Sequence, residues 1–198
     1  MKKFILLITI TGSLCFSQFL TADGLEVNKK LPIWKSLLEN NDIKLVNECV
    51  GKVLIINYID PRYDDQTVPA ILAVRNAIVD GRLSLKNFQA IGIIDCDTTW
   101  EPNSLIKVFA VKENKKLPRL RAILLFDYEG VLGTKYGLII DKKNRNSILL
   151  IDKQGILRAK YRGEMTKKQI TELVNTAVKL QDKPYKSAPN KTLETVKN

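Results

Sequence analysis

Blocks of hydrophobic and polar positions alternate through the middle of the chain and predict strands and helices in turn. The nearly unbroken apolar and β-branched run at residues 53–59 is typical of a strand buried on both faces of a parallel sheet. After a polar break, apolar residues recur at helical spacing from Val68 to Val79, and a second apolar run follows at residues 88–95. Strand, helix and strand in this order predict a right-handed crossover between two parallel strands.

The second half of the chain predicts the remaining elements of one domain. They are a helix over residues 103–111, strands over residues 122–126, 147–151 and 156–161, and a helix from residue 166 to about residue 180. The last two strands form a hairpin, because Gly155 ends their polar connection and readily takes the positive φ that such a turn favours. We therefore expect an α/β domain over residues 23–181.

The two ends of the chain do not follow this pattern. Lys2 and Lys3 precede an apolar run that reaches about Leu20, so residues 1–22 predict a secretory signal peptide, with cleavage after Ala22 or after Ser17. A lipoprotein modified at Cys15 and a buried N-terminal strand or helix are the alternatives. Residues 182–198 lack apolar periodicity and predict a disordered basic tail.

Composition and charge narrow the function. The chain of 198 residues has no histidine and three cysteines, which excludes Ser-His-Asp and Cys-His catalysis, histidine-ligated zinc or haem, and a disulfide-framework fold. Its formal net charge is +11, and loss of the signal peptide removes two lysines and leaves +9. Such a charge favours an anionic surface or an acidic partner protein. Export to a periplasm argues against a nucleic-acid partner, and we expect no transmembrane segment after signal removal and no cofactor.

Two stretches resemble known sequence motifs. Residues 51–58 (GKVLIINY) resemble the strand GKVVLVNFW of the thioredoxin-like, TlpA and peroxiredoxin superfamily, and residues 147–155 (SILLIDKQG) resemble its hairpin TTFLIDKDG. Residues 113–117 and 126–131 are similar to the middle region of the YtfJ-type family of exported thioredoxin-like proteins. The resemblance covers residues 25–181 and implies a thioredoxin-like fold with a central mixed sheet flanked by helices. The activity of that family is not established.

The active-site motif of thioredoxins is missing from this sequence. Thioredoxins carry Trp-Cys-X-X-Cys before the first helix, with a proline five residues after the second cysteine. Matching that proline to Pro69 places Asp60 at the tryptophan and places Pro61 and Asp64 at the two cysteines. Neither proline nor aspartate can attack a disulfide. The cis-proline of thioredoxins falls near Asn146, so we expect a trans peptide bond there.

The two cysteines of the predicted domain cannot pair if the strands are placed as expected. Cys49 precedes the first strand and Cys96 ends its parallel neighbour, which separates them by about 20 Å, whereas a disulfide needs Cα atoms within about 7 Å. Cys96 follows the carboxyl end of a strand, where ligands bind in open α/β sheets, and is a candidate for single-thiol redox chemistry. Asp95 and Asp97 flank it and are expected to raise its pKa, which favours a buried bystander thiol instead.

Acidic residues follow the carboxyl ends of both central strands. Such a cluster can hold a cation such as Ca²⁺ or Mg²⁺, and a cation-dependent enzyme is therefore one alternative function. The competing interpretation is that two of these residues cap the following helix and the others are solvated turn residues. The candidates are Asp60, Asp64, Asp65, Asp95 and Asp97.

A basic cluster follows the second predicted helix, and a shorter one precedes residue 147. Docking to anionic lipid, cell-wall polymer or an acidic protein is one interpretation, and a solvated edge is the other. The two tryptophans, Trp34 and Trp100, are expected to pack in the core or its rim. The cluster comprises Lys112, Lys115, Lys116, Arg119 and Arg121, and the shorter one Lys142, Lys143 and Arg145. The leading hypothesis is a non-enzymatic binding or assembly protein of the cell envelope.

Overall fold

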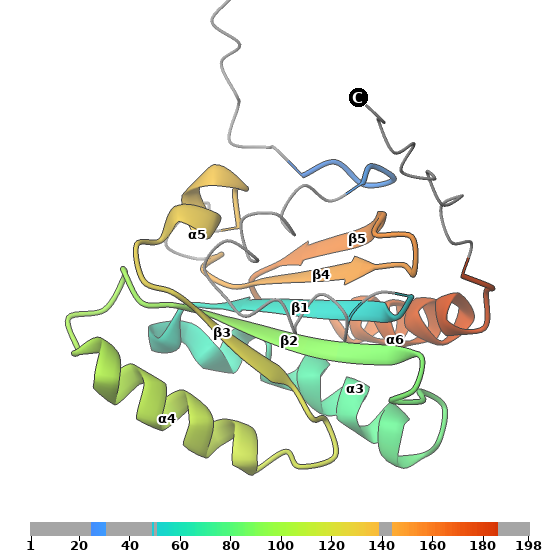
Figure 1. Cartoon of the computed structure of the whole chain (residues 1–198), viewed down its shortest axis with the longest axis horizontal. Coiled ribbons are helices and arrows are strands. Elements are labelled where there is room, and N and C mark those ends of the chain that lie inside the picture. The colour runs from blue at the N-terminus through green and yellow to red at the C-terminus, as the bar shows by residue number, and fades with distance from the viewer. Residues whose placement is uncertain (1–24, 31–48, 50, 139–143, 186–198) are drawn as a thin grey trace, which may run out of the picture.

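A five-stranded mixed sheet with helices on both faces forms the centre of the molecule (Figure 1). The computed structural model describes residues 25–30, 49, 51–138 and 144–185. The strands are β1 (Val53–Ile59), β2 (Phe88–Asp95), β3 (Ile123–Asp127), β4 (Ser147–Ile151) and β5 (Leu157–Arg162). The helices are the 3-10 helix η1 (Pro61–Gln66), α3 (Val68–Val79), α4 (Asn103–Lys115), α5 (Val131–Lys135) and α6 (Lys167–Gln181).

The strands lie in the order β3-β2-β1-β4-β5. β1, β2 and β3 are parallel, whereas β4 runs antiparallel to both β1 and β5. Alternate residues of β1 enter two separate cores. Val53 and Ile55 pack with α3 and α6, whereas Leu54 and Ile56 pack on the opposite face with residues of the α5 region. This burial on both faces explains why β1 is a nearly continuous apolar run.

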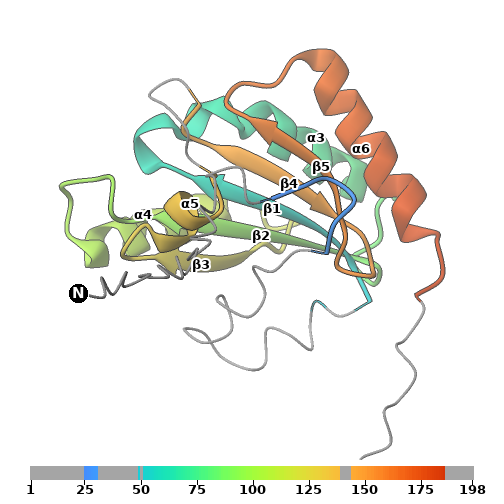
Figure 2. The same cartoon turned by 90° about the horizontal axis from the view of Figure 1, so that it is seen from above.

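The short segment Leu25–Lys30 covers the free edge of the sheet beside β5. The Asn28 amide donates to the carbonyl of Leu157, and Lys30 forms an antiparallel bridge with Ile156. Leu25 is buried in the same core as β1. Figure 2 shows this segment in blue, crossing above β5. An edge strand with unpaired backbone groups invites aggregation, and this segment protects part of β5.

The structure confirms the predicted fold and most of the predicted elements. β1, β2 and β4 have the expected bounds, β3 and β5 start and end one residue later than expected, and α4 extends to Lys115. Gly155 takes φ 78° in the hairpin turn, as predicted. None of the described peptide bonds is cis, which agrees with the expectation for Asn146. The predicted signal peptide and residues 186–198 of the predicted tail lie outside the described residues.

Two short helices were not predicted from the sequence. The N-cap of η1 is Asp60, whose side chain accepts a hydrogen bond from the Arg62 amide, and the N-cap of α5 is Gly130, which has φ 63°. Neither is long enough to show a helical period in the sequence. No helix among the described residues is long and apolar enough to cross a membrane.

Candidate functional site

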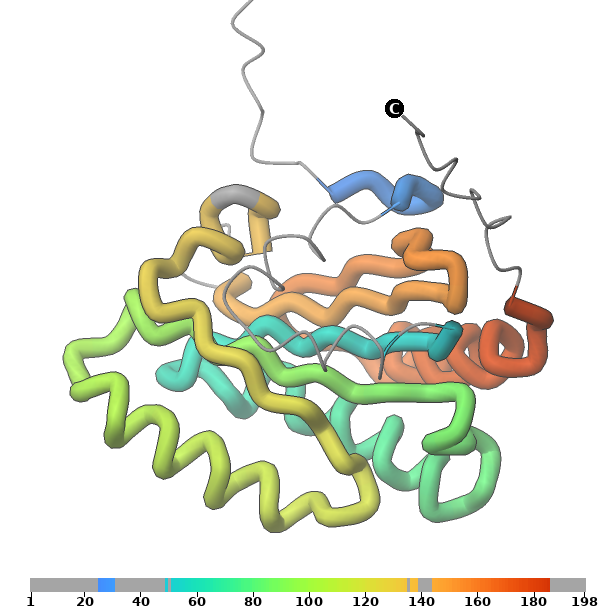
Figure 3. The backbone as a smooth tube through the Cα atoms, viewed as in Figure 1, coloured from blue at the N-terminus to red at the C-terminus, as the bar shows by residue number. Residues whose placement is uncertain are grey.

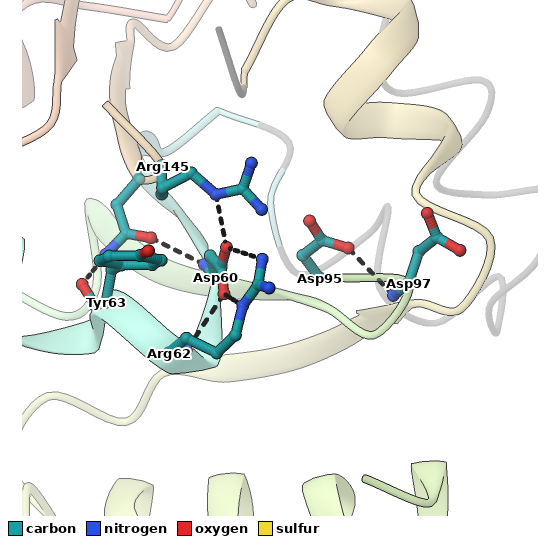
Figure 4. A network of polar contacts seen from close by, with 7 residues as sticks. Asp60, Arg62, Tyr63, Asp95, Asp97 and Arg145 are labelled. Carbon is teal, nitrogen blue, oxygen red and sulfur yellow. Dashed lines mark hydrogen bonds and ion pairs between the residues drawn. The ribbon is translucent and has the colours of Figure 1, made fainter. Parts of the chain in front are cut away.

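The end of β1 holds a buried aspartate where the resemblance places the motif of thioredoxins. The Asp60 side chain is fully buried. The Arg62 side chain donates from Nε at 3.0 Å and from Nη2 at 2.8 Å, one bond to each carboxylate oxygen. Arg145 donates from Nε at 2.7 Å to the same oxygen that Nη2 of Arg62 contacts (Figure 4). Two guanidinium groups therefore bind one buried carboxylate.

The two arginines determine the charge state of this aspartate. Burial on its own raises the pKa of Asp60, but the hydrogen bonds from Arg62 and Arg145 outweigh it, so the pKa lies below its usual value. The Asp60 hydrogen bond correspondingly raises the pKa of Arg62. Tyr63 lies near both cations, with its ring centroid 5.9 Å from Cζ of Arg62 and 6.0 Å from Cζ of Arg145. The site is therefore an ionised, internally paired cluster.

Asn146 fixes the backbone of the same loop from the start of β4. Its Oδ1 accepts a hydrogen bond from the Asp60 amide at 2.7 Å, and its Nδ2 donates to the carbonyl of Tyr63 at 2.5 Å. The Asn146 side chain is fully buried, so both bonds are protected from water. An asparagine at the position where thioredoxins carry their cis-proline thus ties the loop to the sheet.

The structure separates the five acidic candidates. Asp60 is bound by arginines, Asp95 is buried at the end of β2, and the remaining three, Asp64, Asp65 and Asp97, are exposed. Thr67, rather than Asp64 or Asp65, is the N-cap residue of α3. Within the described ranges, no group of three or more cysteine, aspartate or glutamate residues is placed to hold a metal ion. Cation binding at this edge stays a prediction without a converging ligand set.

A third buried acidic residue at this edge, Asp127, did not figure among the sequence candidates. It ends β3 directly beside Asp95 in the parallel register. One of its oxygens accepts hydrogen bonds from the Tyr58 hydroxyl at 2.9 Å and from the amides of Leu132 and Gly133 at 2.9 and 3.2 Å. Its place after an apolar run, like that of Asp95, was the available sequence signal.

Burial controls the protonation of the groups around Asp127. It raises the pKa of Asp95 to about 6; the Asp97 amide opposes this shift, and the charges of Asp127 and Asp60 add to it. Burial also raises the pKa of the Tyr58 hydroxyl, and the charges of Asp95 and Asp127 raise it further. Tyr58 is therefore protonated at neutral pH and donates its hydroxyl hydrogen to Asp127.

Cys96 lies beneath α4 in a small apolar cluster with Ile94 and Ile106. Burial, followed by the charges of Asp95 and Asp127, raises the pKa of its thiol to about 11. The sequence correctly predicted the direction and the effect of Asp95, but the second carboxylate is Asp127 rather than Asp97. As predicted, no disulfide joins Cys96 to Cys49, which is also buried.

The basic candidates lie together on the surface. All five, Lys112, Lys115, Lys116, Arg119 and Arg121, are exposed on the last turns of α4 and the segment before β3. Only Lys116 among them has an ion pair, with Glu113 at 2.6 Å, within the described part of the chain. Of the shorter basic cluster, Lys142 and Lys143 lie outside the described residues.

Two sequence expectations about single residues were wrong. Arg145 does not belong to a solvated loop: it is only 18% exposed, because its guanidinium turns inward to Asp60. Trp100 is not packed: it is 89% exposed just before α4. Trp34 lies outside the described residues. The long side chain of Arg145 turns towards the carboxylate that binds it, and the sequence alone did not identify Asp60 as that partner.

The fold and this edge together define a class: a thioredoxin-like protein with a buried, arginine-bound aspartate beside the positions where the dithiol would stand. The chain belongs to a family described as bacterial proteins of unknown function (YtfJ_HI0045), whose model matches residues 36–180. A search among curated proteins gives no match.

Solved structures share the fold at low sequence identity. A thiol-disulfide isomerase from Corynebacterium glutamicum superposes with a TM-score of 0.52 and 18% identity, over 80% of this chain and 94% of that one. A secreted thiol-disulfide isomerase from the same organism gives a TM-score of 0.49 and 13% identity, over 68% and 75%. StoA from Bacillus subtilis gives a TM-score of 0.43 and 18% identity, over 63% and 83%.

Proposed function

We propose that this protein is an exported binding or assembly protein of the bacterial envelope, built on a thioredoxin-like fold that does not exchange thiols and disulfides. The observation that carries the proposal is the pairing of buried Asp60 with Arg62 and Arg145. The predicted signal peptide at residues 1–22 supports export. The proposed role is therefore recognition of a partner rather than chemistry.

The chemistry of thiol exchange supports this proposal. Exchange needs a thiolate that can reach a disulfide sulfur. Pro61 and Asp64 supply no sulfur, and Cys96 is 4% exposed with a pKa of about 11. At pH 7 such a thiol is ionised in about one molecule in ten thousand. Single-thiol catalysis at Cys96 is therefore less favoured than binding.

A cation-dependent enzyme is also less favoured. The carboxylate of Asp60 is already neutralised by two guanidinium groups, so a cation would have to displace Arg62 or Arg145. Burial raises the pKa of Asp95 to about 6, so below that pH its carboxyl group is largely protonated and binds a cation weakly.

An insulin-reduction assay with dithiothreitol tests the proposal. The wild-type chain is expected to reduce insulin at the rate of dithiothreitol alone, and Cys96→Ser is expected to give the same rate. A reduction rate well above that background in the wild type, abolished in Cys96→Ser, would falsify the proposal. A thioredoxin with its dithiol intact serves as the positive control.

The exposed basic cluster suggests an anionic lipid surface as the partner. Exposed apolar side chains accompany it, since Val108 on α4 is 62% exposed and Trp100 lies just before the helix. A helix that carries lysines and exposed apolar side chains is suited to the interface of an anionic membrane. The charge on the cluster would supply attraction that falls as salt is added.

Vesicle co-sedimentation tests this partner. Binding to vesicles that contain phosphatidylglycerol is expected to weaken in Lys115→Glu/Lys116→Glu. The matched control is Lys167→Glu/Lys168→Glu, which reverses two exposed charges at the start of α6. Equal binding by both double variants would show that net charge, rather than the α4 surface, is responsible.

A further inference from the structure

A groove of about 640 Å³ runs between α3 and α4 on the face of the sheet opposite α5. Figure 3 shows both helices beneath β1, β2 and β3. The lining of the groove is mostly apolar. It includes Ile55, Ala90 and Leu124 from the strands, Ile71 from α3, Ala110 from α4 and Leu117 from the turn after α4. This size falls within the range of pockets that bind small molecules.

Small residues and the placement of α4 keep the groove open. Gly92 lies in its floor, where an added Cβ would come within 3.0 Å of the Leu124 side chain. Ile106, 5% exposed, is the one buried residue of α4, so this helix contacts the sheet along a narrow line. α3 packs mainly against α6 on its other side. The space between α3 and α4 is therefore left unfilled by the core.

The floor of the groove contains a buried polar group that lacks a partner. Asn57, on β1, is 7% exposed and lines the groove. Its Nδ2 donates to the Thr67 hydroxyl at 3.1 Å, but its buried Oδ1 has no hydrogen-bond partner among the described residues. The hydroxyl oxygen of Thr99, in the same lining, is likewise buried and unpartnered there. Buried acceptors are normally satisfied, and a turn of the Asn57 side chain that brings Oδ1 to the groove surface would let it receive a donor from a ligand.

Three of the five charged side chains that line the groove are acidic, although the whole chain is basic. The lining contains the carboxylates of Asp64, Glu101 and Glu113 and the cations of Arg62 and Lys116. Both cations are already paired, Arg62 with Asp60 and Lys116 with Glu113. Within the described residues, neither Asp64 nor Glu101 lies in an ion pair. The end of the groove that contains Asp64 and Glu101 therefore favours a positively charged ligand.

We infer that this groove binds a small apolar amine, with its hydrocarbon body between α3 and α4 and its nitrogen donating to Oδ1 of Asn57. The polar lining residues, Asn57, Thr99 and Glu101, all lie towards the carboxyl ends of β1 and β2, where open α/β sheets bind ligands. This inference extends the proposed binding role to a groove that adjoins the Asp60 cluster through Arg62. Binding of an apolar amine in this groove does not depend on thiol–disulfide exchange.

Three probes of equal chain length test the inference: decylamine, decanol and decanoate, each titrated into the full chain by calorimetry. Decylamine is expected to bind saturably and more tightly than both others. The net charge of +11 by itself favours decanoate, so tighter binding of decylamine would not result from the overall charge of the chain. Decanol or decanoate binding as tightly as decylamine, or no saturable decylamine binding at millimolar concentration, would overturn the inference.

Variants locate the binding. Asn57→Leu keeps the branched shape of the side chain but removes the acceptor, and it is expected to weaken decylamine binding by about tenfold. Val68→Trp fills the groove from its rim and is expected to weaken binding similarly, which keeps the test valid if Asn57→Leu does not fold. Val79→Trp is the control, since both valines are exposed on α3, by 45% and 55%, and only Val68 lines the groove.

Unchanged decylamine binding in Val68→Trp, or equal losses in Val68→Trp and Val79→Trp, would contradict the groove as the site. The insulin assay separates this inference from the proposed function. If the protein reduces insulin and still binds decylamine, only the proposed function without thiol exchange is overturned. If it does not reduce insulin and does not bind decylamine, only the inference about the groove is overturned.

Discussion

The guanidinium of Arg145 lies 2.7 Å from the carboxylate of Asp60, although 85 positions separate the two residues in the chain. This contact joins the end of β1 to the segment before β4, next to the Asn146 bonds to the same loop. Removing one partner of a buried carboxylate lowers the free energy of unfolding more than removing the partner of an exposed carboxylate does. The pairing is therefore structural, and it occupies the edge where related folds carry chemistry.

Arg145→Gln is expected to lower the free energy of unfolding at pH 7 by about 1–3 kcal/mol. The pKa of Asp60 is lowered in the folded protein, so its ionised form stabilises the fold above the ordinary pKa of 3.8. The loss of stability in Arg145→Gln should therefore be complete above pH 3.8 and should shrink as the pH falls through the pKa of Asp60 in the folded protein. Urea denaturation across this range measures it.

Arg82→Gln provides the control for this prediction. The Arg82–Asp80 pair spans 3.6 Å with both side chains about half exposed, so its loss should change stability very little. Equal losses in the two variants would show that the Arg145 contact contributes no more than a surface ion pair.

Asp95→Asn is expected to stabilise the protein at alkaline pH. Burial raises the pKa of Asp95 to about 6, so the folded state binds this proton more tightly than the unfolded state. The wild type therefore loses stability as the pH rises towards and through 6, whereas the amide does not titrate and can still accept the Asp97 bond. The gain should be about 1–3 kcal/mol at pH 8 and should vanish below pH 4.

Urea denaturation at pH 4 and pH 8 measures this effect. Asp97→Asn, which removes an exposed carboxylate two residues away, should change stability by less than about 0.5 kcal/mol at pH 8. A loss of stability in Asp95→Asn at pH 8 would mean that the ionised Asp95 is favourable in the fold.

Gly133→Ala is expected to destabilise the protein by about 1–3 kcal/mol. A Cβ at this position would lie 2.5 Å from the Tyr58 hydroxyl oxygen, which is held by Asp127. In a Tyr58→Phe background the hydroxyl is absent, so the penalty of Gly133→Ala should be smaller. A double-mutant cycle measures this coupling, and additive effects would show that the two residues do not collide.

The sequence predicted the sheet well because its signals are local. Buried β-branched runs define β1, β2 and β4, and the placement of Cys49 and Cys96 at opposite ends of neighbouring parallel strands correctly excluded a disulfide. Gly155 likewise marks its hairpin turn through its own backbone conformation. Such features depend on neighbouring residues and therefore appear in a single sequence.

The site was less predictable because it depends on contacts between distant segments. Arg145 is one of many surface-type cations in the sequence, and only the fold brings it to Asp60. Asp127 accepts hydrogen bonds from the amides of Leu132 and Gly133 in the first turn of α5, which no helical period reveals. The unpartnered oxygen of Asn57 belongs to a residue in the lining of the groove between α3 and α4. These properties belong to the tertiary structure alone.

The rate at which a small disulfide reacts with Cys96 in the native protein tests the central claim most directly. Mass spectrometry assigns the mixed disulfide to Cys96, and the reaction is followed at pH 7 with and without mild urea. A thiol with a pKa of about 11 beneath α4 should react only after local opening, so its rate should be slow and rise steeply with urea. A fast reaction, proportional to disulfide concentration and unaffected by urea, would contradict the account.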